Sequence, residues 1–235
     1  MIYKIPKIKI SLLAFFFINT FMILTIFIED KSFLVGMESG ISEHLSAFLY
    51  FLAFILSFWT FIINKQNRFC LLFSIFCLIC GLEESNYLSN YINYQIPLIQ
   101  NLNVQNDISI HNLKFFHGGS LRDESFSLRI LFKAQNFFRG LFITHFFLLP
   151  LFSKIRLFSK SLKKLKYIFP SKHLRISVGF TLLINLIITF LYAKTGRTRT
   201  DIAEVRELTY AIYIYIYALC DIYSIRFRLS YLFDN

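Results

Sequence analysis

The residues best suited to chemistry lie within residues 80–113, a polar stretch in a sequence that is otherwise mostly hydrocarbon. The stretch begins with two adjacent carboxylates, Glu83 and Glu84, and ends in an amide-rich segment that closes on His111 and Asn112. Carboxylate and imidazole groups bind Zn²⁺ or Mn²⁺ in proteins. A carboxyl group in a low-dielectric site can also act as a general acid or base, because burial raises its pKa toward neutrality. Metal binding and acid/base catalysis are therefore the two functional interpretations of this stretch.

Further carboxylates and amides belong to the same candidate cluster, because the predicted topology places them on the same side of a membrane. The full polar cluster is Glu38, Glu43, Glu83, Glu84, Asn103, Gln105, His111 and Asn112, with Glu43, Glu83, Glu84 and His111 as the catalytic candidates. A structural interpretation is also open, in which Glu83 or Glu84 accepts hydrogen bonds from the amides, or pairs with an arginine such as Arg122, and fixes the loop to the helices. The sequence contains no HExxH helix, nucleophile elbow or phosphate-binding glycine loop. It therefore favours the structural interpretation and identifies no metal, cofactor or substrate.

Composition places the chain in a membrane. Apolar residues make up 56% of the 235 residues, with 30 Phe and a mean hydropathy of +0.55, which is more than a soluble domain of this size buries. The formal net charge of +11 raises the question of nucleic-acid binding. The basic residues lie between the apolar runs and form no continuous groove, however, so they indicate membrane orientation and not a nucleic-acid partner.

The apolar runs predict an all-α fold, a polytopic transmembrane bundle of about six helices that forms one membrane domain. A helix rises ~1.5 Å per residue, so about 20 apolar residues cross the ~30 Å hydrocarbon core. The predicted spans are residues 10–28, 45–63, 69–88, 137–153, 176–193 and 207–225, with an outer loop at 89–136 and an inner basic loop at 154–175. The first run is predicted to be a retained anchor, because it is long for a signal peptide and lacks a small-residue cleavage site.

The third run is short and must continue past its two glutamates. Its apolar part, residues 69–82, would reach only ~21 Å at ~1.5 Å per residue, which is less than the hydrocarbon core. A helix that continued would carry Glu84, Tyr87, Tyr91 and Tyr94 on one face. A charged group at membrane depth is costly unless it faces protein or water, so Glu84 is expected to point into the bundle near the loop at His111.

Two later runs carry distinctive patterns. In the fifth run, Ser177, Thr181, Asn185 and Thr189 recur every four residues, and such polar stripes usually pack helices together and seldom form a conduction path. In the sixth run, tyrosine and isoleucine alternate over residues 213–217 with the period of a strand. Because a lone strand cannot satisfy its backbone in lipid, the sequence predicts a helix there.

The loop at 154–175 holds eight basic residues and no acidic one. Its apolar residues step by three and four, at Ile155, Phe158, Leu162, Leu165 and Phe169, which predicts an amphipathic helix on the membrane surface. The lysines expected to contact anionic lipid are Lys160, Lys163, Lys164 and Lys166. The inner segments hold 15 of the 25 Lys and Arg, so both termini are predicted to be cytoplasmic and the polar cluster extracytoplasmic.

All four cysteines fall within the predicted spans, so no disulfide framework is expected. Cys77 and Cys80 have the spacing of a redox or metal motif. In an apolar helix without flanking charge, such a pair more often packs as two small hydrophobic residues.

Three segments that contain the candidate residues form an ordered pattern: residues 38–43 (ESGISE), 81–85 (GLEES) and 103–112 (NVQNDISIHN). This pattern resembles an uncharacterised family of bacterial polytopic membrane proteins with an E-D-G-x-x-E entry, a G-E-E segment and an N-x-Q-x-x-x-x-L-H-N loop. The chain departs from that pattern at Ser39, which replaces an acid, at Tyr87, which stands near an expected Trp, and at Asn106 and Asp107, which replace Gly and Glu. The resemblance implies a place in the bacterial plasma (inner) membrane and no established activity.

Three function classes fit these observations. The sequence favours a structural or accessory membrane component, whose partners are the lipid bilayer and another membrane protein. A membrane-embedded, metal-dependent enzyme acting on a lipid or lipid-linked substrate is the second interpretation. A small transporter is the third, and it would need a polar path connecting Glu84, Asn185 and Asp221.

Overall fold

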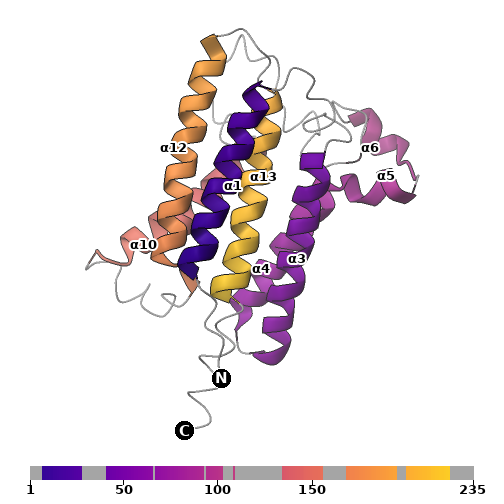
Figure 1. Ribbon diagram of the computed structural model, residues 1–235. Coiled ribbons are helices and arrows are strands. Elements are labelled where there is room, and N and C mark those ends of the chain that lie inside the picture. The colour runs from indigo at the N-terminus through magenta and orange to yellow at the C-terminus, as the bar shows by residue number, and fades with distance from the viewer. Residues whose placement is uncertain are drawn as a thin grey trace. The chain divides into compact units, whose positions relative to one another are not determined.

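The computed structural model describes residues 7–27, 41–65, 67–92, 94–102, 108, 134–155, 168–194 and 200–222. Every regular element in these ranges is a helix, which confirms the all-α prediction. The chain divides into two compact units, one made of Met1–Gly81 with Lys164–Asn235 and the other of Leu82–Lys163. Each unit is described by itself below (Figure 1).

The first unit contains the long helices. They are α1 (Lys7–Phe27), α3 (Ile41–Ile63), most of α4 (Arg68–Glu84), α12 (Lys172–Lys194) and α13 (Thr200–Tyr217), which continues into the π-helical turn η5 (Ala218–Ile222). Five of the predicted spans therefore coincide with helices. Among the described residues, two helical segments are long and apolar enough to cross a membrane, Ile41–Ile63 and Lys172–Leu191, and two shorter apolar segments are Lys9–Phe21 and Phe138–Phe152.

Helix α13 forms the core of this unit, in contact with α1, α3 and α12 (Figure 1). Tyr213 and Tyr217 are completely buried on it, and Phe73 of α4 packs edge-on against Tyr217 with ring centroids 5.2 Å apart. The residues 213–217 are helical, as the bilayer argument predicts, although their alternation has the period of a strand. The strand propensity of tyrosine and isoleucine is overridden here, because a helix satisfies its own backbone hydrogen bonds and α13 packs against helices on several sides.

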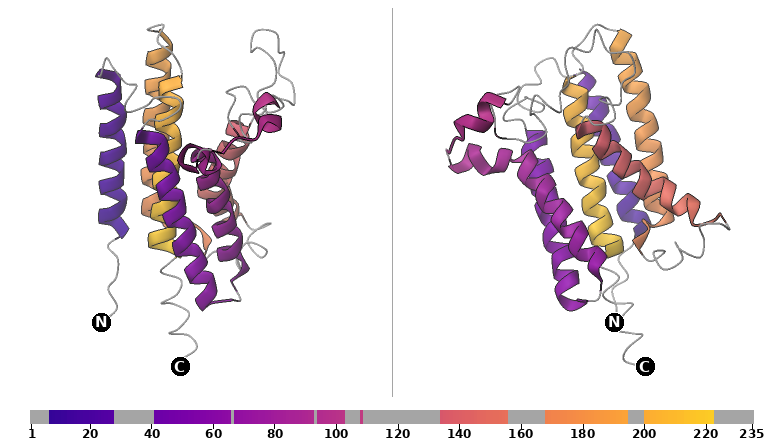
Figure 2. Two further views of the ribbon diagram at one scale, coloured as in Figure 1. Left: turned by 90° about the vertical axis from the view of Figure 1, so that its right-hand side faces the viewer. Right: turned by 180° about the vertical axis from the view of Figure 1, so that it is seen from behind.

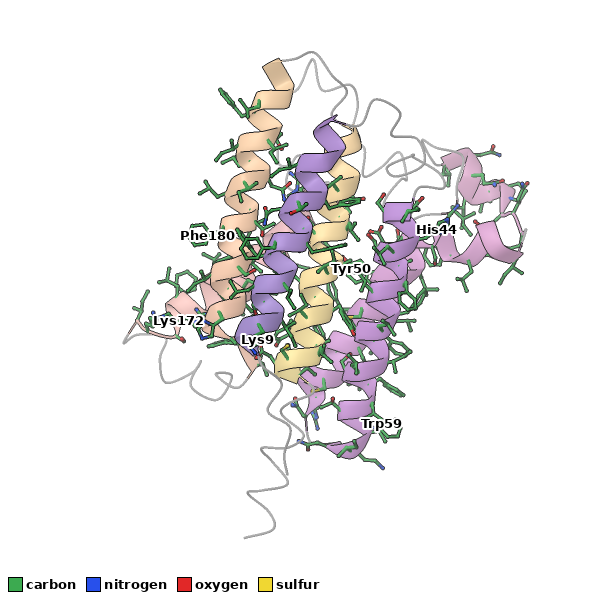
Figure 3. The ribbon with its side chains drawn as sticks, viewed as in Figure 1. Lys9, His44, Tyr50, Trp59, Lys172 and Phe180 are labelled. Carbon is green, nitrogen blue, oxygen red and sulfur yellow. The ribbon has the colours of Figure 1, made fainter. Side chains whose placement is uncertain are left out.

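Helices α1 and α12 of the first unit run in one direction, whereas α3 and α13 run in the other (Figure 2 and Figure 3). Lys9 at the start of α1 and Lys172 at the start of α12 lie at the same end of the unit (Figure 3). On α3, His44 near the start lies toward the opposite end, and Trp59 lies toward the end that holds the two lysines. Helix α13 follows α12 and returns in the opposite direction (Figure 2).

The large apolar side chains of these helices point outward. On α3, Phe48, Ile55 and Trp59 are each more than half exposed. The buried face of α3 consists mostly of small and hydroxyl residues: Ser42, Ser46, Ala47, Tyr50, Ala53, Ser57 and Thr60. Small residues allow close approach of helix backbones, and Tyr50 lies on the side of α3 that faces α13 (Figure 3).

Helix α4 ends at Glu84, so the prediction of one continuous polar face from Glu84 to Tyr94 is wrong. Asn86, Tyr87 and Leu88 follow with φ values of 49°, 52° and 64°, in the left-handed region. Each such residue costs roughly 1–2 kcal/mol relative to the right-handed helix. Side-chain hydrogen bonds that the helical period does not reveal hold this turn.

The second unit begins with this turn, η1 (Asn86–Leu88), and two short helices, α5 (Ser89–Ile92) and α6 (Pro97–Leu102). Its longest helix corresponds to the predicted span at 137–153 and has three parts: α9 (Ala134–Ile143), the π-helical η3 (Thr144–Leu148) and α10 (Leu149–Phe152). Pro150 accounts for the widened turn, because it has no N–H to donate and its ring clashes with the preceding turn of an α-helix. Phe142 and Phe146 stack on the buried side, with ring centroids 4.4 Å apart.

Candidate functional site

The structure describes part of the predicted polar cluster. Glu38, Asn103, Gln105, His111 and Asn112 lie outside the described residues, as do the lipid-contact candidates Lys160, Lys163, Lys164 and Lys166. Glu43 lies at the start of α3 in the first unit, whereas Glu83 and Glu84 end α4 in the second. The convergence of these groups, and the amphipathic helix of the basic loop, therefore stay predictions.

Glu83 takes part in a group of hydrogen-bonded residues that we call the braced turn. Its members are Glu83, Asn86, Tyr87 and Tyr94. The Tyr87 hydroxyl donates to Glu83 Oε1, and the Tyr94 hydroxyl donates to the Tyr87 carbonyl oxygen at 2.6 Å. Asn86 Oδ1 accepts from the Ile108 backbone N–H at 3.0 Å, which fastens a residue 22 positions further on to the same turn. Three hydrogen bonds made by side chains thus hold the left-handed segment in place.

The electrostatics of the braced turn favour a neutral tyrosine beside an ionised glutamate. Burial raises the pKa of Tyr87, and the hydrogen bond and negative charge of Glu83 raise it further. A phenol whose pKa lies above its ordinary value of ~10 stays protonated at neutral pH and donates steadily to the carboxylate. The contact therefore acts as a structural brace. In the described part of the chain, no group of three or more His, Cys, Asp or Glu residues lies close enough to hold a metal ion.

A second polar site, which we call the hydroxyl network, joins three helices of the first unit. Its centre is the Tyr213 hydroxyl on α13, 2.8 Å from Ser177 Oγ and 2.7 Å from Thr181 Oγ1 on α12. Ser177 Oγ donates to the Ser11 carbonyl oxygen on α1 at 3.0 Å, and Asn19 Nδ2 of α1 donates to Thr181 Oγ1 at 3.2 Å. All these side chains are buried.

The direction of every hydrogen bond in the network follows from its two ends. Each hydroxyl has one proton, and Ser177 gives its proton to the Ser11 carbonyl, so Tyr213 must donate to Ser177. Thr181 must then donate to Tyr213, and it accepts in turn from the Asn19 amide. A chain that begins at an amide N–H and ends at a carbonyl has no terminal group that takes up or releases a proton near neutral pH. It therefore ties the three helices together.

The start of α12 is held by the end of α13 through two further hydrogen bonds. Asp221 Oδ2 in η5 accepts from the Ser171 backbone N–H at 2.9 Å, and the Tyr217 hydroxyl donates to the Ile168 carbonyl oxygen. The first N–H groups of a helix have no partner within it and carry partial positive charge. Asp221 thus supplies a carboxylate from another helix to the N-terminus of α12.

Sequence reasoning found one half of this arrangement. The stripe at Ser177, Thr181 and Asn185 was predicted to pack helices, and the three residues are indeed buried. Its partner on α13 was missed, although Thr209, Tyr213, Tyr217 and Asp221 also recur every four residues and are all buried. The Tyr and Ile alternation over 213–217 conceals this second stripe, because it draws attention to a period of two.

The four cysteines all lie in the described part of the chain, and none of them forms a disulfide; Cys70, Cys77 and Cys220 are buried, whereas Cys80 is half-buried. This placement agrees with the packing interpretation of the Cys77 and Cys80 pair. Comparison with known proteins finds no match to this chain among protein-family models, curated proteins or solved structures. The resemblance to a polytopic membrane family therefore stays a prediction, and the function has to be argued from the geometry above.

Proposed function

We propose that this chain is a multi-pass integral membrane protein that acts as a structural or accessory component, with the helices of its first unit crossing the bilayer. The observation that carries the proposal is the distribution of side chains on α12. Leu186 is 67% exposed and Phe180 is 56% exposed, whereas Thr181 and Asn185 on the opposite face are 0% and 5% exposed. A water-soluble helix has the reverse arrangement, with its apolar stripe toward the core.

The same distribution recurs on neighbouring helices. On α1, Leu13 and Phe16 are exposed, while Ser11 and Asn19 are buried. Between helices in lipid, the hydrocarbon solvent is as apolar as leucine, so small residues and hydrogen bonds drive association. Small and hydrogen-bonding residues occupy the buried faces of the first unit. Its exposed faces carry large apolar side chains, which are suited to contact with lipid.

The proposed topology has six spans and cytoplasmic termini. Helices α1 and α13, the first and last of the unit, run in opposite directions, which supports an even total number of crossings (Figure 2). Lys9 and Lys172 lie at one end of the unit, and the positive-inside rule assigns that end to the cytoplasm (Figure 3). Anionic lipid is the proposed contact of the basic loop there, and the resemblance described above implies a bacterial plasma membrane.

The non-catalytic assignment is supported by the way in which the buried polar groups are used. The hydroxyl network joins α1, α12 and α13 through hydrogen bonds, and the braced turn contains a phenol that donates to a carboxylate. Both fix the positions of helices or turns. A component of this kind would act by presenting a rigid surface to another membrane protein.

Cysteine labelling in cells tests the topology. In a background without Cys70, Cys77, Cys80 and Cys220, a cysteine introduced at Lys163 should react with a membrane-impermeant maleimide only after the membrane is opened. A cysteine introduced at Lys194 should react in intact cells. Labelling of the Lys163 variant in intact cells contradicts the topology, and release of the whole chain by alkaline carbonate contradicts the membrane assignment.

A further inference from the structure

Two buried asparagines in the first unit have amide atoms without a partner among the described residues. Asn185 is 5% exposed, and neither its Oδ1 nor its Nδ2 makes a hydrogen bond. Asn19 is 6% exposed, and its Oδ1 also lacks a donor, while its Nδ2 donates to the Phe15 carbonyl oxygen at 2.6 Å and to Thr181. Buried amides without partners are rare in native proteins, because each unmade hydrogen bond leaves a desolvation penalty uncompensated.

The two amides lie near one another in the fold. Asn19 is bonded to Thr181, and Asn185 is one helical turn beyond Thr181 on the same face of α12. Both asparagines lie near the middle of their helices: Asn185 is ~20 Å along α12 from Lys172, at ~1.5 Å per residue. Polar partners for them must therefore come from within the bundle and not from its ends.

We propose that the hydroxyl network continues past Asn19 through bound water, held between α1 and α12 by the amides of Asn19 and Asn185. The chemistry of the free atoms selects this ligand. Two carbonyl oxygens need donors and one NH₂ group needs an acceptor, and water offers two donors and two acceptors in one small molecule. Buried waters typically make about three hydrogen bonds to polar groups that would otherwise be unpaired. An anion would serve only the NH₂ group, and a cation would serve only the oxygens.

The consequence is that α1 and α12 are joined in two ways: directly, at Ser11 and Asn19, and through water, at Asn185. Neither kind of contact depends on whether the protein is a scaffold, an enzyme or a transporter. The proposal therefore goes beyond the proposed function.

Nuclear magnetic resonance of the intact chain in detergent, with ¹⁵N-labelled asparagine, tests the proposal directly. The side-chain NH₂ signal of Asn185 is assigned as the signal lost in Asn185→Leu or Asn185→Gln. We expect a cross peak between this NH₂ group and water protons. The Asn19 NH₂ group, which donates to protein atoms, is the matched control and should show a weaker one. No cross peak at Asn185, or one no stronger than at Asn19, overturns the proposal.

The sign of a stability change gives a second, independent test. Asn185→Leu replaces the amide by a hydrocarbon of similar size. If water serves the amide, the substitution displaces it and leaves Asn19 Oδ1 unpaired, and the melting temperature should fall by about 2–4 °C or more. If the amide is simply unpaired, leucine should raise the melting temperature or leave it unchanged, which overturns the proposal. Should Asn185→Leu fail to fold, the unmodified chain still decides by its water cross peak.

Discussion

The Tyr213 hydroxyl on α13 lies 2.7 Å from Thr181 Oγ1 on α12, although 32 residues separate the two positions in the chain. The same hydroxyl donates to Ser177, so one phenol connects two turns of the neighbouring helix. Through Ser177 and Thr181 it is also linked to α1. The Tyr213 hydroxyl oxygen is thus the centre of a hydrogen-bond network that joins three helices of the first unit, α1, α12 and α13.

Removal of this oxygen should therefore destabilise the unit. Tyr213→Phe keeps the ring but leaves Ser177 without its donor and Thr181 without its acceptor. We expect a loss of about 1–2 kcal/mol, since interhelical hydrogen bonds in membrane proteins average ~0.6 kcal/mol with a maximum near 1.7 kcal/mol, and a buried group left unpaired adds to this. Thermal unfolding in detergent measures this loss of stability.

Tyr215→Phe is the matched control, because that half-buried ring lies on another face of the same helix and should change stability by less than about 0.5 kcal/mol. Equal effects of the two variants would contradict the role of the network.

The positions of the helices could be predicted from the lengths of the apolar runs in the sequence. A run of about 20 apolar residues must be helical in a bilayer, and each predicted span contains a helix. The packing partners could not be predicted, since hydropathy records which residues avoid water and not which residues meet. Tyr213 illustrates the limit: its place in a helix was predicted, but its bond to Thr181 depends on how α12 and α13 pack.

A pair of glycines offers a second prediction about packing. A Cβ atom added at Gly81 on α4 would lie 3.1 Å from Phe51 Cε1 on α3, whereas one added at Gly140 would meet nothing within 4 Å. Gly140→Ala should therefore stabilise its helix by about 0.5–1 kcal/mol through helix propensity alone. Gly81→Ala gains the same propensity but must displace the ring, and we expect it to be less stable than the Gly140→Ala variant by about 1–3 kcal/mol. Unfolding by heat or by denaturing detergent compares the two. A gain at Gly81 as large as that at Gly140 would contradict close packing of α4 on Phe51.

The end of α4 was predicted incorrectly for a local reason. The spacing of Glu84, Tyr87 and Tyr91 is helical, and a period-based prediction has no means of detecting a side chain that bonds across a turn. Tyr87 bonds to Glu83, and Asn86 bonds to Ile108, and these contacts favour a left-handed turn over another helical one. Sequence patterns identified the polar chemistry of this stretch but not the geometry that uses it.

The braced turn should weaken at high pH. Tyr87→Phe removes the donor to Glu83, and we expect a loss of about 0.5–1.5 kcal/mol at neutral pH. Because the folded-state pKa of Tyr87 is raised, its contribution is fully present below the unfolded pKa of ~10 and declines as the pH rises above that value. The difference in unfolding free energy between the wild type and Tyr87→Phe should thus be constant from pH 7 to 9 and shrink above pH 10. A difference that grows with pH would contradict the assignment of the phenol as donor.

The carboxylate of Asp221 should govern the start of α12. It accepts a hydrogen bond from the Ser171 N–H, and the Ser171 carbonyl oxygen accepts one from the Arg175 N–H at 3.0 Å. Ser171 thus connects the carboxylate to the first turn of α12. Asp221→Ala removes the acceptor and its charge, and we expect a loss of about 1–3 kcal/mol. Asp221→Asn keeps an acceptor but not the charge, and it should lose less stability, because it lacks only the electrostatic interaction with the helix N-terminus, about 0.3–1 kcal/mol.

Hydrogen exchange separates this local role of Asp221 from a general loss of stability. In Asp221→Ala, amide protons of residues 171–175 should exchange faster relative to those of residues 181–185, whereas Tyr213→Phe should affect residues 181–185 at least as strongly. Uniform acceleration along α12 in the Asp221→Ala variant would show that the carboxylate stabilises the whole unit and does not anchor the end of this helix.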